Sequence, residues 1–395
     1  MGRGEGLYSI LRSARWEPIA ADFLRGALTG GGGRGPIQPV VGDFLDRVEG
    51  DGRTVGVGHL VVRAPNWVGD LVMATPILEA AVRDRRFGRV TIAVRSHLVG
   101  VLTGGPLEEH VLRIPDRREE VSLLRGLGAD AVLLLTNSPG ASWRALRAGI
   151  RIRAGVSLGG RGFLLTHRVI PPTRAGRRAP IPTAHLQRDV AGLLGILVPD
   201  LTPKLHVTDA EREEVREMLV RNGVDPGSGY VLCAPGAAFG AAKLWPPEYH
   251  AAVLDGLAER TGWTGVISGG PGEEETMGKV LAATTHGAVS LADERRDLRG
   301  LKALVEGARM LLVGDSGPRW YAAAFGVPCV TIMGPNFPEL TATSFERCEV
   351  VRRDDLECQP CIRRSCPLGH HRCMRDLPPA RALEAAERLL AVQAR

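Results

Sequence analysis

The sequence lacks several features that would place it at once in a familiar class of protein. No stretch approaches the roughly 18 consecutive apolar residues of a membrane-spanning helix, and the opening residues lack the cationic-then-apolar order of a secretory signal. A Gly-x4-Gly-Lys-Ser/Thr loop, a His-Glu-x2-His pair and an Asp-x-Asp pair are also absent. These absences predict a cytoplasmic protein and disfavour a nucleotide held through Mg²⁺.

What the chain does contain is a globular composition that is rich in loop-forming residues. Its 395 residues are 44% hydrophobic and include 50 Gly and 27 Pro. A chain of this length is typical of two domains of roughly 150 to 200 residues. The net charge of +6 at pH 7 favours an anionic partner, and nucleic acid, acidic lipid and a phosphorylated sugar all meet that condition.

Short apolar runs alternate with helical stretches twice along the chain, which is typical of parallel sheets covered by helices. The predicted strands are at 61–62, 90–94, 111–114 and 131–135, and then at 230–234, 265–268, 288–291, 310–313 and 329–333. We therefore predict two doubly wound α/β domains, at 57–205 and 206–377, joined by a Pro-containing linker at 198–207. Residues 1–56 are predicted to form an extension that is flexible or partly helical, and 378–395 a closing helix.

The first strand-to-helix junction carries a carboxylate. The segment Arg63 to Asp70 ends a predicted strand and opens a helix, and ligands bind at such junctions in open parallel sheets. Asp70 could therefore face a cleft and take a proton from an attacking hydroxyl. The alternative is an ordinary aspartate at a helix start, which the helix dipole stabilises by about 0.5 kcal/mol.

Three junctions in the second predicted domain suit anions or hydroxyls. The segment Gly314 to Pro318 offers Asp315 or Ser316 as a cap and leaves free N–H groups for a diphosphate, although a capped helix that binds nothing would look the same. Lys243, in a loop of small residues, could neutralise a leaving phosphate or be merely solvated. Glu273 could bind ribose hydroxyls, or it could simply interact favourably with the dipole of the helix that follows it.

Four late cysteines form the pattern Cys358-x2-Cys361-x4-Cys366-x6-Cys373, with two histidines inside it. Four thiols at short range could close a tetrahedral zinc site, although the paired knuckles of a zinc ribbon are missing. Reduced, packed or redox-sensitive thiols are the alternative, because an odd total of seven cysteines argues against a disulfide framework. We predict a structural zinc as a candidate only, and no cofactor for catalysis.

The span 144–178 contains nine arginines and no acidic residue. A segment of one sign creates a positive field for phosphate or carboxylate groups, although many such runs are simply solvated. The absence of acidic residues from this span favours the interpretation that it binds phosphate or carboxylate groups.

In their order along the chain, these motifs resemble those of the bacterial heptosyltransferases of glycosyltransferase family 9, and of the heptosyltransferase II branch in particular. The resemblance covers roughly residues 59–392, and several motifs at matching separations carry it. They are Arg63–Asp70, Leu135–Ser138, Gly160–Thr166, Pro235–Pro247, Gly269–Glu273, Gly314–Pro318, Gly334–Pro335 and Cys358–Cys373.

The resemblance implies a GT-B fold, in which two Rossmann-like domains face each other across a cleft and the last helix returns to the first domain. It also implies an inverting transfer of L-glycero-D-manno-heptose from ADP-heptose to the heptosyl-Kdo2-lipid A inner core of lipopolysaccharide. That acceptor is an anionic glycolipid, so the enzyme is expected to associate peripherally with the inner membrane.

The resemblance also assigns roles to residues. Asp70 matches the general base of the family and Lys243 its phosphate-neutralising lysine. The donor is expected to contact Gly236, Ala237, Glu273, Asp315, Ser316, Gly317 and Pro318, and the acceptor to contact Asn66, Trp67, Arg144 and Arg161.

Two departures from the family pattern leave alternatives open. Trp320 stands where the family has a histidine, and Leu244 where it has an arginine. A family 9 transferase that uses another nucleotide sugar or acceptor is therefore the alternative. A basic nucleic-acid-binding protein with a four-cysteine zinc module is a further one, but the order of the strand-end motifs argues against it, and we predict no nucleic-acid partner.

Overall fold

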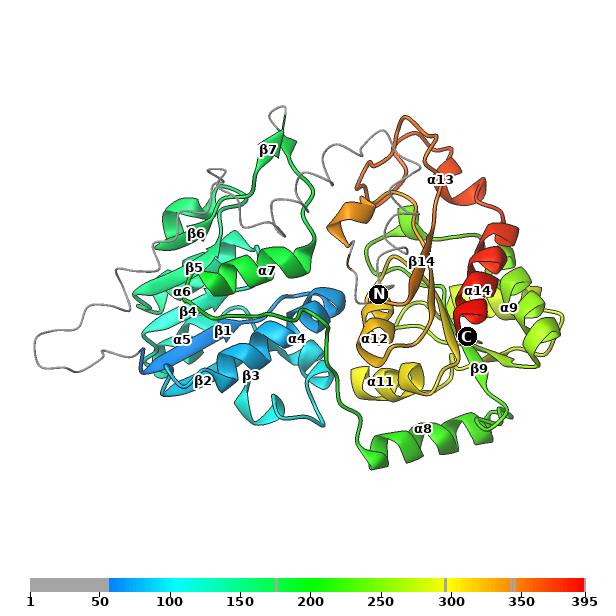
Figure 1. The fold of residues 1–395 in the computed structure, drawn as a ribbon, viewed down its shortest axis with the longest axis horizontal. Helices are drawn as coiled ribbons and strands as arrows, with labels where there is room; N and C mark the ends of the chain where they lie inside the picture. Colours follow the sequence, from blue (N-terminus) through cyan, green and yellow to red (C-terminus); the bar gives the residue numbers. More distant parts are fainter. Residues whose placement is uncertain (1–56, 175–176, 295–296, 342, 344–345, 394–395) are drawn as a thin grey trace, which may run out of the picture.

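The computed structural model describes residues 57–174, 177–294, 297–341, 343 and 346–393, so the predicted extension at 1–56 lies outside the described residues. Two six-stranded sheets with helices on their faces lie side by side (Figure 1). We refer to them as the first half and the second half. This arrangement confirms the predicted α/β architecture of two doubly wound units.

The first sheet has the strand order β3-β2-β1-β4-β5-β6 and every pairing in it is parallel. Its strands are β1 (His59–Arg63), β2 (Arg89–Arg95), β3 (Val111–Ile114), β4 (Ala131–Leu134), β5 (Ile152–Val156) and β6 (His167–Val169). All five residues of β1 are buried, as expected for a central parallel strand covered on both faces. Sequence analysis missed β5 and β6, which are partly exposed and contain arginines.

The second sheet repeats this order as β11-β10-β9-β12-β13-β14, again with parallel pairings. Its strands are β9 (Tyr230–Ala234), β10 (Thr264–Ile267), β11 (Val289–Ser290), β12 (Met310–Gly314), β13 (Cys329–Ile332) and β14 (Cys348–Val351). In both sheets the order reverses beside the first strand, between β1 and β4 and between β9 and β12. Loops at such reversal points form ligand-binding crevices in doubly wound folds.

Helices cover both sheets, and their bounds define the loops at the reversal points. The first half contains α4 (Val68–Arg83), α5 (Glu120–Gly126), α6 (Pro139–Arg147) and α7 (Thr183–Gly192). The second half contains α8 (Asp209–Arg221), α9 (Pro247–Thr261), α10 (Glu274–Ala283), α11 (Leu298–Glu306), α12 (Pro318–Phe325), α13 (Arg372–Arg375) and α14 (Pro379–Gln393). Short hairpin strands β7 (Thr173–Arg174) and β8 (Arg177–Arg178) follow β6. None of the helices within the described ranges has the length and apolar character needed to cross a membrane.

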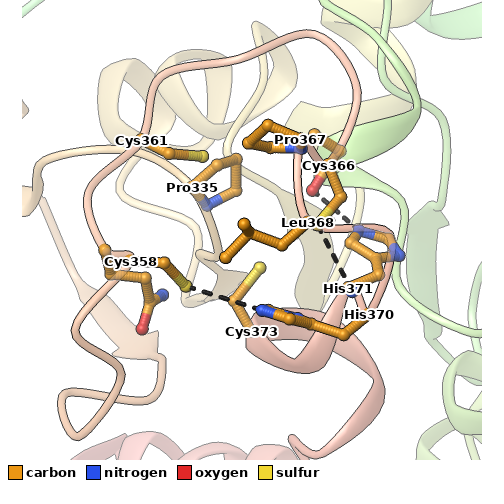
Figure 2. Close-up of a pocket in the computed structure, with 11 residues that line it drawn as sticks. Pro335, Cys358, Cys361, Cys366, Pro367, Leu368, His370, His371 and Cys373 are labelled. Atoms are coloured by element: carbon orange, nitrogen blue, oxygen red, sulfur yellow. Dashed lines mark hydrogen bonds between the residues drawn. The ribbon is translucent and has the colours of Figure 1, made fainter.

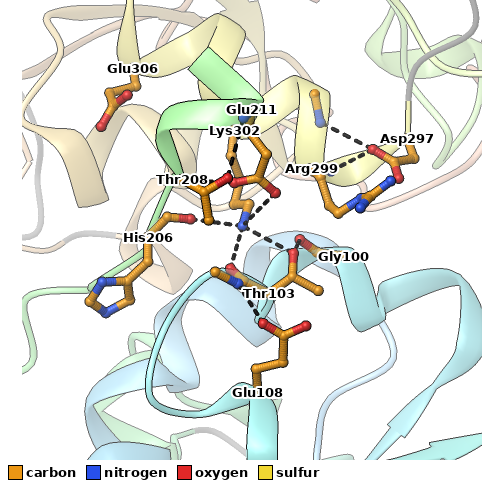
Figure 3. Close-up of polar contacts among 12 residues, drawn as sticks. Gly100, Thr103, Glu108, His206, Thr208, Glu211, Asp297, Arg299, Lys302 and Glu306 are labelled. Carbon is orange, nitrogen blue, oxygen red and sulfur yellow. Dashed lines mark hydrogen bonds and ion pairs between the residues drawn. The ribbon is translucent and has the colours of Figure 1, made fainter. Parts of the chain in front are cut away.

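The two halves meet where α4 packs on α12 and where the short helix η1 (Ser96–Val101) packs on α11. One hydrophobic cluster runs through both halves at this junction. Lys302 of α11 lies at its edge, with its Nζ bonded to Thr103 of the first half and to His206 of the linker (Figure 3). The first turn of α4 is therefore held against the first turn of α12.

The closing helix differs from expectation. The resemblance predicted that it returns to the first half, but α14 packs on α9, β13 and β14 of the second half (Figure 1). Its apolar face, which includes Ala382, Ala385 and Leu389, is buried in a hydrophobic cluster formed by the second half. The expected return to the first half is therefore wrong for the described part of this helix, because the second half already covers its apolar face.

Candidate functional site

Asp70 lies at the start of α4, where the first half meets the second. Burial, together with the nearby charge of Asp315, raises the pKa of Asp70 to about 6, and the charge of Lys243 opposes that rise. Both of these charged groups belong to the second half. The predicted base thus faces two predicted donor-site residues across the junction, and it is a carboxylate with unusually high proton affinity.

Lys243, Asp315 and Asn336 form a compact cluster on the opposite side of the junction. Nζ of Lys243 donates to Oδ2 of Asp315 at 2.6 Å and to the Asp315 carbonyl oxygen at 2.8 Å, and Nδ2 of Asn336 donates to the same Oδ2 at 2.7 Å. Burial alone would raise the pKa of Asp315, but the Lys243 charge and these hydrogen bonds lower it overall. Two neighbouring carboxylates therefore differ in proton affinity, which suits Asp70 to proton transfer and Asp315 to a fixed charge.

The turn that precedes α12 differs in detail from the sequence prediction. Sequence analysis proposed Asp315 or Ser316 as the cap, whereas the N-cap is Gly317 and no side chain caps the helix. A Cβ atom on Gly317 would lie 2.9 Å from Cβ of Val68 in α4, so glycine permits the close contact between the halves. Pro318 has no N–H, and the Trp320 N–H already donates to the Gly317 carbonyl oxygen at 3.0 Å, so an anion would bind at the N–H groups of the turn that precedes the helix.

Gly236 and Glu273, both predicted donor contacts, lie against each other. A Cβ atom on Gly236 would lie 2.0 Å from the Glu273 carboxyl carbon, so a larger residue there would displace the Glu273 carboxylate. Oε2 of Glu273 accepts from the Gly270 N–H at 2.8 Å, and burial raises the pKa of Glu273 against the effect of that bond. Ala237 is half-buried on the loop after β9. The loops after β9 and β10 thus meet at Gly236 and Glu273.

A cavity of about 350 Å³ opens beside Asp70, mainly within the first half. Its walls come from the loop after β1, the loop after β4, helix α7 and one residue of the second half, Leu340. Asn66 and Trp67, the predicted acceptor contacts, line it together with Asp70. Nδ2 of Asn66 donates to Oγ1 of Thr136 at 2.9 Å, which ties the two loops together, while Trp67 stays 52% exposed.

The other two predicted acceptor contacts, Arg144 and Arg161, have partners within the protein. Arg161 is buried, and its guanidinium donates to the carbonyl oxygens of Val156 at 2.8 Å and Thr136 at 2.6 Å. Burial lowers its pKa to about 10. Arg144 donates from Nε to Oε2 of buried Glu120 at 2.6 Å. Neither arginine is among the residues that line the cavity, and each has protein partners.

Four of the cysteines line a second, very small cavity of about 20 Å³, together with Pro335, His370 and His371 (Figure 2). Sγ of Cys358 lies 4.0 Å from Nε2 of His370, and the His371 N–H donates to Sγ of Cys366 at 3.4 Å. All seven cysteines are free thiols. Across the described part of the chain, no three His, Cys, Asp or Glu side chains are placed to hold a metal ion, so the candidate zinc site at Cys358, Cys361, Cys366 and Cys373 is not formed. The alternative of reduced, packed thiols fits this geometry.

Two residues at the site were missed by sequence analysis. Asn336 follows the Gly334-Pro335 pair just after β13, and this position after a strand was the available signal. Gln187 of α7 donates from Nε2 to the Asp70 carbonyl oxygen at 3.0 Å. Nothing in the local sequence distinguishes Gln187, because its contact joins residues 117 positions apart.

The sequence of this chain is similar to those of known heptosyltransferases. The model for glycosyltransferase family 9 (heptosyltransferase) matches residues 120–372. Lipopolysaccharide heptosyltransferase 2 of Escherichia coli strain K12 is 27% identical over 352 residues, which cover 84% of this chain and 98% of that protein. Lipooligosaccharide heptosyltransferase 2 of Campylobacter jejuni is 30% identical over 159 residues, which cover 40% of this chain and 49% of that protein. The chain thus matches about half the length of the Campylobacter relatives.

Two solved structures share the fold. A glycosyl transferase of family 9 from Veillonella parvula matches with a TM-score of 0.71 and 20% identity, over 86% of this chain and 99% of that one. The E. coli ADP-heptose lps heptosyltransferase II matches with a TM-score of 0.68 and 24% identity, over 85% of this chain and 100% of that one. These similarities confirm the expected GT-B fold.

Proposed function

Because this chain belongs to glycosyltransferase family 9, the heptosyltransferases, we propose that it transfers L-glycero-D-manno-heptose from ADP-heptose to the heptosyl-Kdo2-lipid A inner core of lipopolysaccharide. The observation that carries the proposal is the meeting of Asp70 from the first half with Lys243 and Asp315 from the second. Residues 57–205 would then bind the acceptor and residues 206–377 the donor. The relatives in E. coli and Campylobacter are named lipopolysaccharide and lipooligosaccharide heptosyltransferase 2, and these names support a heptose as the sugar and a lipopolysaccharide as the acceptor.

Asp70 is the general base of the proposed reaction. The acceptor hydroxyl gives its proton to an Asp70 carboxylate oxygen as its own oxygen attacks the anomeric carbon from the side opposite the diphosphate. The new C–O bond forms while the bond to the diphosphate breaks, so the anomeric configuration inverts and ADP leaves. A pKa of about 6 makes Asp70 a stronger base than an ordinary aspartate and still leaves it mostly ionised at pH 7.

Positive charge for the leaving diphosphate comes from Lys243, and the N–H groups of the turn before α12 supply further donors. Charged donors of this kind are each worth about 3 kcal/mol by analogy with lost oxyanion-hole groups. Asp315 and Asn336 hold Lys243 in place, and Gly236, Ala237 and Glu273 form the wall where the nucleoside would lie. In this proposal the reaction needs no metal ion.

The cavity beside Asp70 takes the sugar of the acceptor, with Asn66 and Trp67 at its rim. The lipid part of such an acceptor stays in the inner membrane, so we propose a cytoplasmic protein that associates with that membrane peripherally. The net charge of +6 and the exposed Phe163 of the first half, 81% exposed, support this location. Sedimentation with vesicles of anionic lipid A precursor should recruit the protein at low salt and release it at high salt; no recruitment at low salt would remove the membrane part of the proposal.

The test of the reaction combines binding and turnover. Asp70→Asn should lower turnover at least a hundredfold and leave the ADP dissociation constant within about twofold, because the base acts only on the acceptor proton. Near-normal turnover of Asp70→Asn would overturn the assignment of the base.

A family 9 transferase with another nucleotide sugar is the second candidate. The observation in its favour is Trp320, which is buried at the junction where the family has histidine. Titration with ADP, UDP and GDP separates the two candidates, since the proposed donor requires ADP to bind most tightly.

A further inference from the structure

The cysteine-rich loop, residues 358–373, lies against the two segments that present Lys243 and Asn336 to Asp315. It bonds the first segment at Ala242, the residue before Lys243. The Ala242 N–H donates to the carbonyl oxygen of Arg364 at 3.0 Å, and the Ala242 carbonyl oxygen lies 2.9 Å from Nε2 of His371. Because a carbonyl oxygen only accepts, Nε2 of His371 must carry the proton.

Close packing strengthens this connection. Gly240 has a φ of 144°, and a Cβ atom there would lie 2.5 Å from the carbonyl oxygen of Arg364, so only glycine allows the approach. The ring of Phe239 lies 4.9 Å from Nζ of Lys243 and 5.5 Å from Cζ of Arg364, within cation–π distance of both. The loop thus contacts the Lys243 segment through backbone hydrogen bonds at Ala242, through close packing on Gly240 and through the ring of Phe239.

The same loop bonds the second segment. The N–H groups of Cys361 and Ile362 donate to the Pro335 carbonyl oxygen at 3.1 and 3.0 Å, and Nε2 of Gln359 donates to the Gly334 carbonyl oxygen at 2.6 Å. Asn336 comes next in the chain and donates to Asp315. One loop therefore holds both partners of the Asp315 carboxylate.

Few contacts within the Lys243 segment fix its backbone, so contacts from other segments matter more there. Its only regular structure is the single-turn helix η4, Ala241–Lys243, in a run of glycine and alanine. A single turn of this kind fixes its backbone weakly, and small side chains bury little apolar area to offset the entropy of ordering. Bonds from outside the segment must therefore set the position of the Lys243 backbone.

We propose that the cysteine-rich loop positions the donor site, and that His371 is the positioning residue through which it places the Lys243 ammonium. The inference rests on the role of Lys243 in the proposed function. His371 has a left-handed backbone, with a φ of 51°, and its N–H bonds Sγ of Cys366. The Cys366 thiol at the small cavity thus holds the His371 backbone (Figure 2), and the His371 side chain bonds Ala242.

A matched pair of substitutions tests the bond. His371→Asn keeps a residue type that tolerates the left-handed backbone but removes the donor that reaches Ala242, whereas the amide nitrogen of His371→Gln can take the place of Nε2. We expect His371→Asn to weaken ADP binding about five- to tenfold and to lower turnover, as the loss of one hydrogen bond predicts, and His371→Gln to stay within about twofold of the parent. Ser365→Ala, at an exposed position of the same loop that does not line the small cavity, is the control and should change neither value.

A double-mutant cycle shows whether His371 acts through Lys243. In a Lys243→Met background, His371→Asn should change ADP affinity by less than twofold, because the group that it positions is gone. An equal effect of His371→Asn in both backgrounds, or failure of His371→Gln to restore binding, would overturn the inference.

Hydrogen exchange tests the inference independently of the proposed function. His371→Asn should increase amide exchange at residues 240–244 without any nucleotide present, and unchanged exchange there would also overturn the inference. If Lys243→Met alone leaves ADP affinity and turnover unaltered, the role of Lys243 in the proposed function fails, and the exchange result alone then decides whether the loop holds this segment.

Discussion

Lys302 of the second half donates a hydrogen bond from Nζ to the carbonyl oxygen of Thr103 in the first half, at 2.6 Å. The same Nζ donates to the carbonyl oxygen of His206 in the linker at 2.8 Å, and its nearest carboxylate, that of Glu211, is 4.0 Å away (Figure 3). The side chain is fully buried, and burial lowers the pKa of Lys302. One ammonium thus joins the two halves and the linker.

Lys302→Met should weaken the contact between the two halves and the linker. Two partly buried carbonyl oxygens would lose their donor, which costs about 2 to 4 kcal/mol of unfolding free energy. We expect a lower urea midpoint and faster proteolysis of the segment between α7 and α8. Lys279→Met is the control, because Lys279 pairs only with Glu275 on the surface of α10 and is 61% exposed, so it should change stability by less than about 0.5 kcal/mol. Equal effects of the two substitutions would contradict the role of Lys302.

The raised pKa of Asp70 predicts opposite effects on activity and stability. As a base, Asp70 must be ionised, so kcat/KM should rise with pH through about 6 and then level off. A raised carboxyl pKa means that the folded protein holds the proton more tightly than the unfolded chain. Its contribution to stability is present below about pH 3.8 and is lost as the pH rises through about 6.

Asp70→Asn should therefore stabilise the protein at pH 7.5 by up to about 3 kcal/mol while it removes activity. The increase in melting temperature caused by Asp70→Asn should fall toward zero near pH 4, because the Asp70 carboxyl of the folded parent protein is already protonated there. Thermal melts at both pH values and a pH–rate profile provide the measurement, and an equal melting shift at both pH values would refute the burial argument.

Gly69 in α4 makes the junction sensitive to one methyl group. A Cβ atom on Gly69 would lie 2.5 Å from Cδ1 and 3.0 Å from Nε1 of Trp320. Gly69→Ala should lower the melting temperature and kcat/KM, because α4, which carries Asp70, must move away from α12. The smaller ring in Gly69→Ala/Trp320→His should recover part of both losses. Gly278→Ala, where nothing lies within 4 Å, should be neutral or slightly stabilising, and a loss there comparable to that of Gly69→Ala would discount the steric explanation.

Glu120 is the buried partner of three arginines. It accepts from Nε of Arg63 at 2.7 Å, Nη2 of Arg95 at 3.0 Å and Nε of Arg144 at 2.6 Å. Glu120→Gln should destabilise the protein by about 3 to 5 kcal/mol, since it leaves buried cations without their counter-charge. Urea denaturation measures this, with the exposed Glu213→Gln as a near-neutral control. A loss below about 1 kcal/mol would show that the arginines find other partners.

The strands were predictable where burial is continuous. Strands β1 and β9 are buried at every residue, and each contains a continuous apolar run, residues 60–62 in β1 and residues 230–234 in β9. β5, β6 and β14 are partly exposed and include Arg153, Arg168 and Glu349, so their sequences do not differ from loops in composition. The spacing and apolar character of residues identify strands that are buried on both faces. They do not identify partly exposed strands at the edge of a sheet.

The candidate site was only partly predictable. Asp70, Lys243 and Asp315 were identified because each follows the end of a strand. The reading of Arg144 and Arg161 as acceptor contacts did not anticipate their partners, because Glu120 and the carbonyl oxygen of Thr136 are 24 and 25 residues away. A charge count over a segment cannot show which charges the fold has already paired.

The sequence by itself determined the two repeated parallel sheets and the loops that follow their strands, since local apolar runs and turn residues encode both. Only the tertiary structure decided which half the closing helix covers, that Asp70 has a pKa of about 6, and that one cysteine-rich loop supports both Lys243 and Asn336. These properties depend on distances between residues far apart in the chain, and such distances exist only once the two halves have packed together.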